Sequence, residues 1–259
     1  MPDRIRLDGR VAVVTGAAGV IGSATIRLLA ERGARIVAVD RKQADLQAAI
    51  KDLPASAQPL AITADVTSED EVADYVRAAV GQFGAIDVFY NNAGIEGDIA
   101  PITKYSLETF RKVIDVNVVG VFLGLKHVLP VMLKQNKGSI INTASIAGLI
   151  GSPEIAVYSA SKHAVIGLTK SAAQECSATG VRVNCVCPGL IDSRMLSTII
   201  QGRNPGNAPV SNERILERIP ARRLGQASEV ASIVAFLASD EASYVSGSAY
   251  TVDGGRTAA

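Results

Sequence analysis

Residues 11–22 of the chain read Val-Ala-Val-Val-Thr-Gly-Ala-Ala-Gly-Val-Ile-Gly, and this stretch decides the fold. The unbroken apolar run Val11–Val14 predicts a strand that is buried on both faces. Helical periodicity begins at Ile21 and continues to Arg32, where Gly33 ends it. The glycines therefore form a tight turn between a buried strand and the N-terminus of a helix. Free N–H groups and the helix dipole make such a turn a binding site for phosphate groups.

The same alternation of short apolar runs and helical segments continues along the chain. Repeated βαβ units of this kind predict a parallel sheet with helices on both faces and right-handed crossovers. We therefore expect an α/β fold, a Rossmann-type doubly wound parallel sheet of about seven strands, in a single domain over residues 1–259. The further expected strands are 35–39, 60–62, 86–90, 138–143 and 181–187, and the further expected helices are 43–53, 106–134, 156–176 and one that opens at Ser68.

The regular alternation fails once, between Asp192 and Leu224. A loop of this length inside a compact domain usually has a function. We expect residues 193–220, approximately, to form a lid that excludes water from a substrate.

Composition excludes several classes of protein. The 26 basic residues balance 25 acidic ones, and no basic stripe points to a nucleic-acid partner. The N-terminus has no apolar signal core, and Lys126 interrupts the apolar run that comes nearest to a membrane span, so we expect no membrane association and a cytoplasmic location. The cysteines, Cys176, Cys185 and Cys187, are expected to be buried and reduced.

Asp40 ends the second expected strand, eighteen residues beyond Gly22. A carboxylate at this place accepts hydrogen bonds from both ribose hydroxyls of a dinucleotide and repels a 2′-phosphate, which favours NAD over NADP. Arg41 and Lys42 follow directly, and basic side chains there can hold a phosphate, so NADP is the less favoured alternative. The other reading of the segment is a glycine-rich turn in which Asp40 only caps a strand end.

Tyr158 and Lys162 lie four residues apart in an expected helix, so their side chains project from one face. A free tyrosine, with a pKa near 10, is a poor acid–base catalyst at neutral pH. A neighbouring ammonium group, together with a positive nicotinamide ring, favours the phenolate and lowers that pKa. The pair by itself is commonplace, and its meaning depends on the motifs around it.

Several such motifs occur in order, and with them the chain resembles the short-chain dehydrogenase/reductase family from about Leu7 to Gly255. The resemblance is to the short, single-domain branch of that family. The motifs are Asn91–Gly94, Asn117 in the next long helix, Ser145 thirteen residues before Tyr158, the Tyr158–Lys162 segment itself, Pro188–Gly189 and Asp253–Gly255.

The resemblance implies a catalytic set. Ser145 would hydrogen-bond the substrate oxygen, and Tyr158 would pass the proton. Lys162 would lower the pKa of Tyr158 and bind the nicotinamide ribose. Asn117 would hold a water molecule that links Lys162 to solvent. The alternative for single members is structural, with Ser145 as a strand-end cap and Asn117 as a polar residue that bends a helix.

The family also implies the cofactor contacts and the assembly. Asp65 and Val66 would contact adenine, and Ile191 and Ser193 would meet the nicotinamide amide. The long helices near 106–134 and 156–176 would form the interface of a homotetramer. The complete set of implied cofactor residues is Gly16, Gly19, Val20, Ile21, Gly22, Asp40, Arg41, Asp65, Val66, Asn92, Ala93, Gly94, Tyr158, Lys162, Pro188, Gly189, Ile191 and Ser193.

Val20 departs from the pattern of the short branch, in which this position is usually glycine. The spacing of Gly16, Gly19 and Gly22 instead fits longer members, many of which are sugar-nucleotide epimerases and dehydratases. A valine here is expected to crowd the pyrophosphate or to shift the turn.

The residues expected around the reacting carbon are mostly apolar, which favours an uncharged alicyclic, aryl or aliphatic substrate. Segments 91–97 and 240–245 are similar to those of reductases that act on cyclic ketones. Glu96 lies either at the mouth of the pocket or on an exposed loop, and the lid residues Arg194 and Arg203 either meet an anionic substrate or are solvated. The apolar residues are Ile95, Ile146, Leu149, Ile150, Leu190 and Met195.

No metal site is expected, because His127 and His163 lack acidic or cysteine neighbours at ligand spacing. The sequence thus predicts an NAD-dependent oxidoreductase that interconverts a secondary alcohol and a ketone. The alternatives are an NADPH-dependent 3-oxoacyl reductase, a sugar-nucleotide epimerase or dehydratase, and a non-catalytic dinucleotide-binding regulator.

Overall fold

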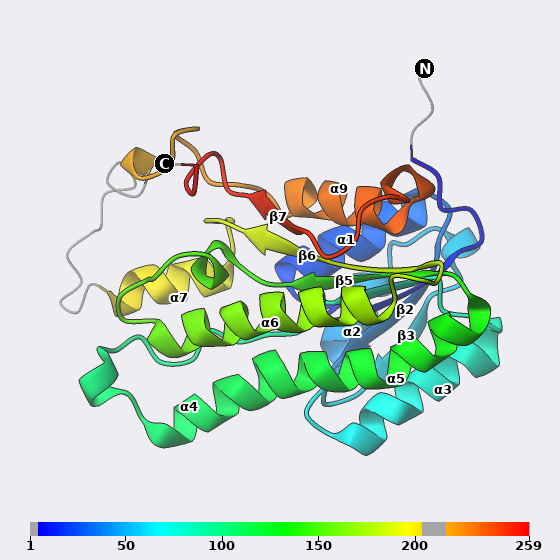
Figure 1. Ribbon diagram of the computed structural model, residues 1–259, viewed down its shortest axis with the longest axis horizontal. Coiled ribbons are helices and arrows are strands. Elements are labelled where there is room, and N and C mark those ends of the chain that lie inside the picture. The colour runs from blue at the N-terminus through cyan, green and yellow to red at the C-terminus, as the bar shows by residue number, and fades with distance from the viewer. Residues whose placement is uncertain (1–4, 204–215, 259) are drawn as a thin grey trace.

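The computed structural model describes residues 5–203 and 216–258. Over these residues seven parallel strands form one sheet, in the order β3-β2-β1-β4-β5-β6-β7 (Figure 1). The predicted doubly wound sheet is therefore confirmed. The strands are β1 (Val11–Thr15), β2 (Arg35–Asp40), β3 (Leu60–Thr63), β4 (Val88–Asn91), β5 (Gly138–Thr143), β6 (Val181–Pro188) and β7 (Ala249–Val252).

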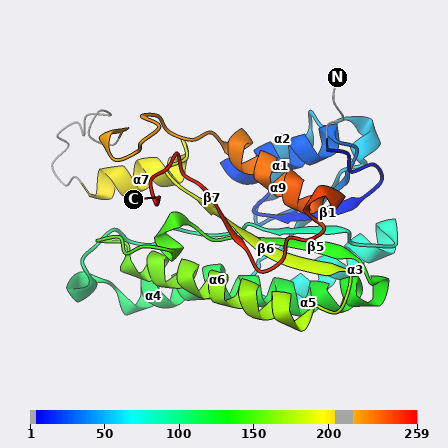
Figure 2. The ribbon, with the colours of Figure 1, turned by 45° about the horizontal axis from the view of Figure 1, so that its top comes forward.

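Helices cover both faces of the sheet, and in Figure 2 α1, α2 and α9 lie on one side and α3 to α6 on the other. The alternation along β1 shows how the two cores arise. Val11 and Val13 pack in the core beneath α3 and α5, whereas Ala12 and Val14 pack beneath α1 and α9. A central strand with apolar residues at every position is therefore buried on both sides. The helices are α1 (Val20–Glu31), α2 (Gln43–Ile50), α3 (Glu69–Phe83), α4 (Leu107–Ile114), α5 (Gly120–Gln135), α6 (Ala156–Glu175), α7 (Arg194–Gly202) and α9 (Ala227–Ala238).

Helices α4 and α5 are joined by a π-helical segment, Asp115–Val119, into one helix over Leu107–Gln135. This helix is long and apolar enough to cross a membrane by length and composition alone, and Lys126 interrupts it as the sequence shows. Its most apolar window is 44% buried within the protein, and Val128 and Met132 are fully buried in the core. The helix thus packs like a core helix of a folded domain.

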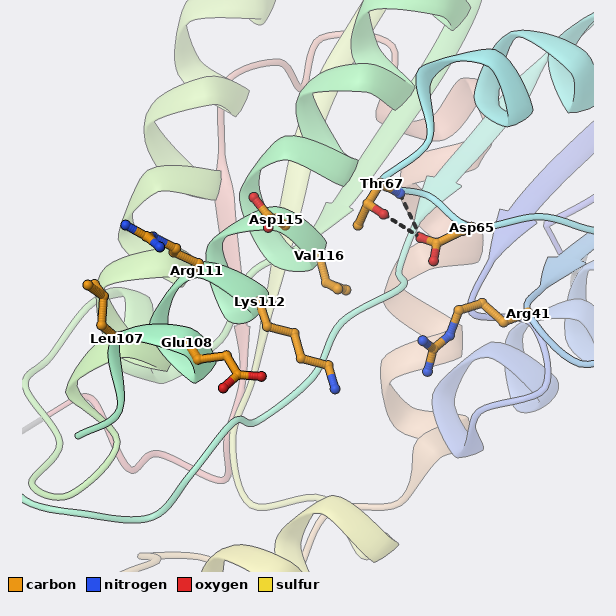
Figure 3. Close-up of a pocket in the computed structure, with 9 residues that line it drawn as sticks. All are labelled: Arg41, Asp65, Thr67, Leu107, Glu108, Arg111, Lys112, Asp115 and Val116. Carbon is orange, nitrogen blue, oxygen red and sulfur yellow. Dashed lines mark hydrogen bonds between the residues drawn. The ribbon is translucent and has the colours of Figure 1, made fainter. Parts of the chain in front are cut away.

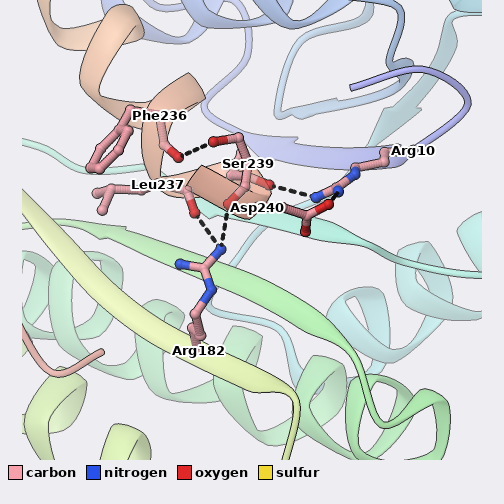
Figure 4. A network of polar contacts seen from close by, with 7 residues as sticks. Arg10, Arg182, Phe236, Leu237, Ser239 and Asp240 are labelled. Atoms are coloured by element: carbon pink, nitrogen blue, oxygen red, sulfur yellow. Dashed lines mark hydrogen bonds and ion pairs between the residues drawn. The ribbon is translucent and has the colours of Figure 1, made fainter. Parts of the chain in front are cut away.

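Two arginines donate hydrogen bonds to carbonyl groups at the C-terminal end of α9 (Figure 4). Arg182 of β6 donates to the carbonyl oxygens of Leu237 at 2.7 Å and Ser239 at 3.1 Å. Arg10 donates to the carbonyl oxygen of Ala238 at 3.0 Å. The last carbonyls of a helix have no partner within the helix, and positive charge is favourable at this end. These contacts therefore fix α9 to the sheet.

We predict that Arg182→Met lowers the free energy of unfolding by about 1–3 kcal/mol, because the two carbonyls then lose a charged donor. Chemical denaturation measures this loss. The control is Arg77→Met, which removes an ion pair with Asp74 on the exposed face of α3. That change should stay within about 0.5 kcal/mol of the wild type. Equal losses in the two variants would contradict the role given to Arg182.

Candidate active site

The strand order reverses between β1 and β4, because the chain proceeds from β1 outward in both directions. In open parallel sheets this switch point leaves a crevice at the carboxyl ends of the strands, where ligands bind. The glycine turn follows β1, and the segment that begins at Asn91 follows β4. The fold therefore brings the glycine turn and the segment that begins at Asn91 to the same carboxyl edge of the sheet.

The glycine turn depends on two residues without side chains. Gly16 has a φ of +63°, a conformation that residues with a Cβ rarely adopt. A Cβ on Gly22 would lie 2.1 Å from the carbonyl oxygen of Gly16, so α1 can approach β1 only because this position is glycine. A Cβ on Gly19 would lie 3.3 Å from the same oxygen, which is close but tolerable.

Val20 is the first residue of α1, and its side chain is 46% exposed. The turn beneath it is closed by a hydrogen bond from the N–H of Gly19 to the oxygen of Gly16, at 3.1 Å. Val20 therefore leaves the internal geometry of the turn intact. Its isopropyl group lies at the helix N-terminus, where the sequence places a pyrophosphate.

Hydrogen bonds hold the segment after β4 against the glycine turn. The Thr15 hydroxyl accepts from the N–H groups of Asn92 at 2.9 Å and Ala93 at 3.1 Å. The side-chain amide of Asn92 donates to the carbonyls of Thr15 and Gly16, at 3.1 and 3.2 Å. The structure thus brings together the predicted cofactor residues of β1 and β4.

Asp40 also lies at the glycine turn. Its carboxylate accepts from the N–H of Ala18 at 3.0 Å and from the N–H of Arg41 at 2.8 Å. The residue therefore performs the capping role that the sequence left open, and it does so beside the turn that would hold a dinucleotide.

A cavity of about 380 Å³ lies next to the ends of β2 and β3 (Figure 3). Figure 3 shows Arg41 on one side of it and Lys112 of α4 on the other. The N–H and hydroxyl of Thr67 donate to Asp65 at 2.9 and 2.8 Å. Burial works to raise the pKa of Asp65, but these two bonds and the charge of Arg41 outweigh it and hold the pKa below its ordinary value. The cavity is lined by Arg41, Asp65, Thr67, Leu107, Glu108, Arg111, Lys112, Asp115 and Val116.

Only one of the two predicted adenine contacts lines this cavity. Asp65 lines it, whereas Val66 is 7% exposed and packs against Gly120 of α5. The sequence missed Lys112 and Val116, which also line the cavity. Both belong to an ordinary helical pattern, and only the fold brings that helix opposite Arg41 and Asp65.

Tyr158, Ser145 and Lys162 lie together next to the segment that follows β4. Tyr158 is 9% exposed on α6, Ser145 follows β5, and Lys162 is one helical turn beyond Tyr158. The Nζ atom of Lys162 lies 5.6 Å from the centre of the Tyr158 ring and donates to the carbonyl oxygen of Thr143 at 2.7 Å. A Cβ on Gly94 would lie 3.4 Å from the same Nζ atom, so the segment after β4 closes over the lysine.

Burial governs the charges of this pair. It raises the pKa of Tyr158 to about 12, while a hydrogen bond with Ser145 acts in the opposite direction and the charge of Glu96 raises it further. Burial also lowers the pKa of Lys162 to about 8. The expectation that Lys162 lowers the pKa of Tyr158 is therefore not met in the protein alone, because a low dielectric penalises charge on both groups.

Asn117 lies in the π-helical segment and is fully buried. Its side-chain amide donates to the carbonyl oxygen of Ile95 at 2.9 Å and to the hydroxyl of Ser161 at 3.0 Å. Its side-chain oxygen accepts from the N–H of Ile95 at 2.9 Å. Asn117 thus clamps the segment after β4 to α6, and its role in holding a water molecule stays a prediction.

The residues after β6 reach the same edge. The Ser145 hydroxyl lies 3.5 Å from the carbonyl oxygen of Pro188, and the N–H of Gly189 donates to Val252 at 3.0 Å. Ile191 is 4% exposed, and the hydroxyl of Ser193 caps α7. Their contacts with a nicotinamide amide remain predictions.

A small apolar cluster surrounds Tyr158. Met195 was expected there, but Leu149 and Ile150 are 41% and 40% exposed and lie outside it. The sequence missed Ile99, Ala147 and Ile155, because their loops have no periodicity that marks a buried face. The cluster comprises Ala147, Ile155, Tyr158, Ile99, Met195 and Ile199.

Helix α7 covers this cluster and forms the first part of the predicted lid. Residues 204–215 of that lid lie outside the described residues. Within the ranges 5–203 and 216–258, no group of three or more histidine, cysteine, aspartate or glutamate side chains is arranged to hold a metal ion.

Comparisons with known proteins agree with this geometry. Residues 16–257 match a family model described as enoyl-(acyl carrier protein) reductase. Levodione reductase from Leifsonia aquatica is 40% identical to the chain over 257 residues, which cover 98% of the chain and 96% of that protein. The chain therefore belongs to the short-chain dehydrogenase/reductase family.

Two further relatives show the range of this family around the chain. The 3-oxoacyl-[acyl-carrier-protein] reductase FabG from Thermotoga maritima (strain ATCC 43589 / DSM 3109 / JCM 10099 / NBRC 100826 / MSB8) is 41% identical, covering 97% of the chain and 99% of that protein. A solved structure of NAD+-bound xylitol dehydrogenase superposes with a TM-score of 0.92 and 36% identity, over 96% of the chain and 99% of that structure. The structure of levodione reductase gives a TM-score of 0.94 and 39% identity, over 98% and 100%.

We predict that Gly22→Ala weakens NADH binding by about 5- to 150-fold, because the added methyl group meets the Gly16 carbonyl and forces α1 away from the turn. Overpacking of this kind costs about 1–3 kcal/mol, and 1.4 kcal/mol corresponds to a factor of ten. Titration of NADH fluorescence measures the change. Gly81→Ala is the matched control, since a Cβ there meets nothing within 4 Å. Equal dissociation constants for the two variants would contradict the prediction.

Proposed function

We propose that the chain is an NAD-dependent dehydrogenase that interconverts a secondary alcohol and a ketone by hydride transfer, with Tyr158 as the general acid and base. The observation that carries the proposal is the meeting of Ser145, Tyr158 and Lys162 next to the segment after β4. The apolar cluster around Tyr158 favours an uncharged substrate that is apolar or cyclic. Relatives named for levodione and for cyclohexanol support a cyclic one.

The residues present fit a dinucleotide. The glycine turn opens on the free N-terminus of α1, and the cavity at Arg41 and Asp65 has room for an adenine. At Gly94 a Cβ would lie 3.4 Å from the Nζ atom of Lys162, so the lack of a side chain there lets the backbone lie close to the lysine. When bound, the cofactor would supply the hydride acceptor or donor and a positive charge at its oxidised ring.

The side chains would then divide the work of proton transfer. The Ser145 hydroxyl hydrogen-bonds the substrate oxygen and holds it next to the phenol. In alcohol oxidation the Tyr158 oxygen takes the hydroxyl proton, and in ketone reduction it returns one. The phenolate is the reactive form for oxidation, so the pKa of about 12 must fall in the complex. Lys162, with a pKa of about 8, is still mostly protonated at pH 7 and stabilises that phenolate.

The choice of NAD rests on Asp40. Its carboxylate is held at the turn by the N–H of Ala18, in a position to accept ribose hydroxyls and to repel a 2′-phosphate. A second candidate, an NADPH-dependent 3-oxoacyl reductase, is supported by Arg41 and Lys112, which bring positive charge to the adjoining cavity, and by the FabG relative.

We also infer a homotetramer. Apolar side chains on the helix Leu107–Gln135 are exposed in the single chain, and an interface between copies would cover them. The exposed residues are Leu107, Phe110, Phe122 and Leu133.

Tyr158→Phe should reduce turnover of a secondary alcohol by about 10²–10⁴-fold, because the phenyl ring cannot transfer a proton. Binding of NADH, measured by fluorescence, should be nearly unchanged. Tyr244→Phe is the control, because that tyrosine is fully exposed and should leave turnover at the wild-type value. Retained activity in Tyr158→Phe would refute the proton-transfer role.

Asp40→Ala should reduce the ratio of kcat/KM with NAD to kcat/KM with NADP by about tenfold or more. The variant loses a carboxylate that bonds the ribose and repels a 2′-phosphate, and a tenfold change corresponds to roughly 1.4 kcal/mol. Asp40→Asn keeps an oxygen for the N–H of Ala18 and tests the charge alone. Asp45→Ala, in the first turn of α2, serves as the control. An unaltered ratio in both Asp40 variants would count against NAD selection by this residue.

A further inference from the structure

Arg203 lies at the C-terminal end of α7 and joins this helix to the loop 149–155, which leads into α6. Its Nη2 atom donates to the hydroxyl of Ser152 at 2.9 Å and to the carbonyl oxygen of Pro153 at 2.7 Å. Its Nε atom lies 3.8 Å from a carboxylate oxygen of Glu154. The sequence left open whether this arginine meets an anionic substrate or is solvated. The structure instead gives its guanidinium group partners in three consecutive residues of one loop.

The loop that Arg203 holds contains a strained residue. Glu154 has a φ of +66°, in the left-handed region that a residue of this type rarely adopts. Such a conformation persists only where the surrounding contacts hold it. Arg203 supplies contacts at Glu154 and at the residue before it, and the N–H of Ala100 donates to the carbonyl oxygen of Glu154 at 2.9 Å. Without the guanidinium group, we expect this part of the loop to relax to another conformation.

The end of α7 also packs on the segment that follows β4. A Cβ on Gly202 would lie 2.6 Å from the side chain of Ile99, so the helix meets that segment directly. Ala100, the next residue in the segment, is the donor to Glu154. The segments that follow β4, β5 and β6 therefore contact one another in pairs. The hydrogen bonds of Arg203 connect the second of these segments with the third.

The same three segments supply the apolar cluster at Tyr158. Ile99 comes from the segment after β4, Ile155 from the loop before α6, and Ile199 from α7. Ile155 directly follows the strained Glu154, and Tyr158 lies in the first turn of α6, three residues further on. The contacts between the segments thus set how the walls of the cluster stand relative to one another and to the phenol.

We propose that Arg203 is a positioning residue that holds the walls of the substrate pocket together and thereby sets the affinity for the substrate. The inference rests on the proposed alcohol dehydrogenase function and concerns its substrate side alone. A preformed apolar wall binds a substrate more tightly than one that must be ordered on binding. The cofactor side is fastened separately, since Thr15 accepts hydrogen bonds from the N–H groups of Asn92 and Ala93 at the glycine turn.

The test measures kcat and KM at saturating NAD for the best substrate in a panel of secondary alcohols that includes cyclohexanol. Arg203→Met should raise KM by about tenfold, because hydrogen bonds from a charged donor are lost. The value of kcat should stay within about threefold, because the variant removes no contact with the reacting atoms. Arg203→Lys keeps the charge and one donor group, so its KM should rise less. The control is Arg77→Met, on the exposed face of α3, which should keep the wild-type values.

A second variant tests whether Arg203 acts through the loop. Ser152→Ala removes one of its acceptors and should raise KM by a smaller factor. In the double variant the rise should be smaller than the product of the two single rises, because both changes break the same contact. NADH binding should equal that of the wild type in every variant, which shows that each is folded.

Three results would overturn the inference and leave the dehydrogenase function intact. They are an unchanged KM in Arg203→Met, single rises that multiply in the double variant, and a rise in KM that is matched by an equal loss of NADH affinity. Failure of the wild type to oxidise any alcohol of the panel would overturn the proposed function, and the inference with it.

Discussion

A phenol and an ammonium group lie side by side in a crevice that water hardly reaches, and burial penalises charge on both of them. It raises the pKa of Tyr158 to about 12 and lowers that of Lys162 to about 8. In the protein alone burial thus makes the charged form of each group less favourable than it is in water. A positive ring bound beside the phenol would favour the phenolate and lower the pKa of Tyr158.

The segment after β4 connects this pair to the rest of the site. Its first part is hydrogen-bonded to Thr15 at the glycine turn, and its middle is clamped by Asn117. Glu96 follows in the same segment and forms an ion pair with Arg194 of α7 at 3.3 Å. One short loop therefore connects the glycine turn with α7, and the π-helical segment that holds Asn117 fixes the middle of that loop.

The apolar cluster at Tyr158 is the feature that would limit the substrate, because hydrocarbon side chains favour a ring or an alkyl chain. Helix α7 contributes Met195 to this cluster and Arg194 to the ion pair with Glu96, so its position affects both contacts.

By itself the sequence determined what depends on local pattern. The apolar run Val11–Val14, the glycines after it and the spacing of Tyr158 and Lys162 predict a buried strand, a phosphate-binding turn and two groups on one helical face. Each of these features lies within a few residues, where backbone geometry alone relates the side chains. The family pattern added Ser145 and Asn117, which the structure brings to the same crevice.

Only the tertiary structure decided what depends on contacts between distant segments. The sequence leaves open whether Glu96 is an exposed loop acid, whereas the fold buries it and pairs it with Arg194 of α7. Ile99 and Ile155 carry no periodic signal, yet they meet Tyr158. The direction of the pKa shift of Tyr158 was also beyond the sequence. It depends on how much water the surrounding elements exclude, and a spacing of four residues says nothing about that.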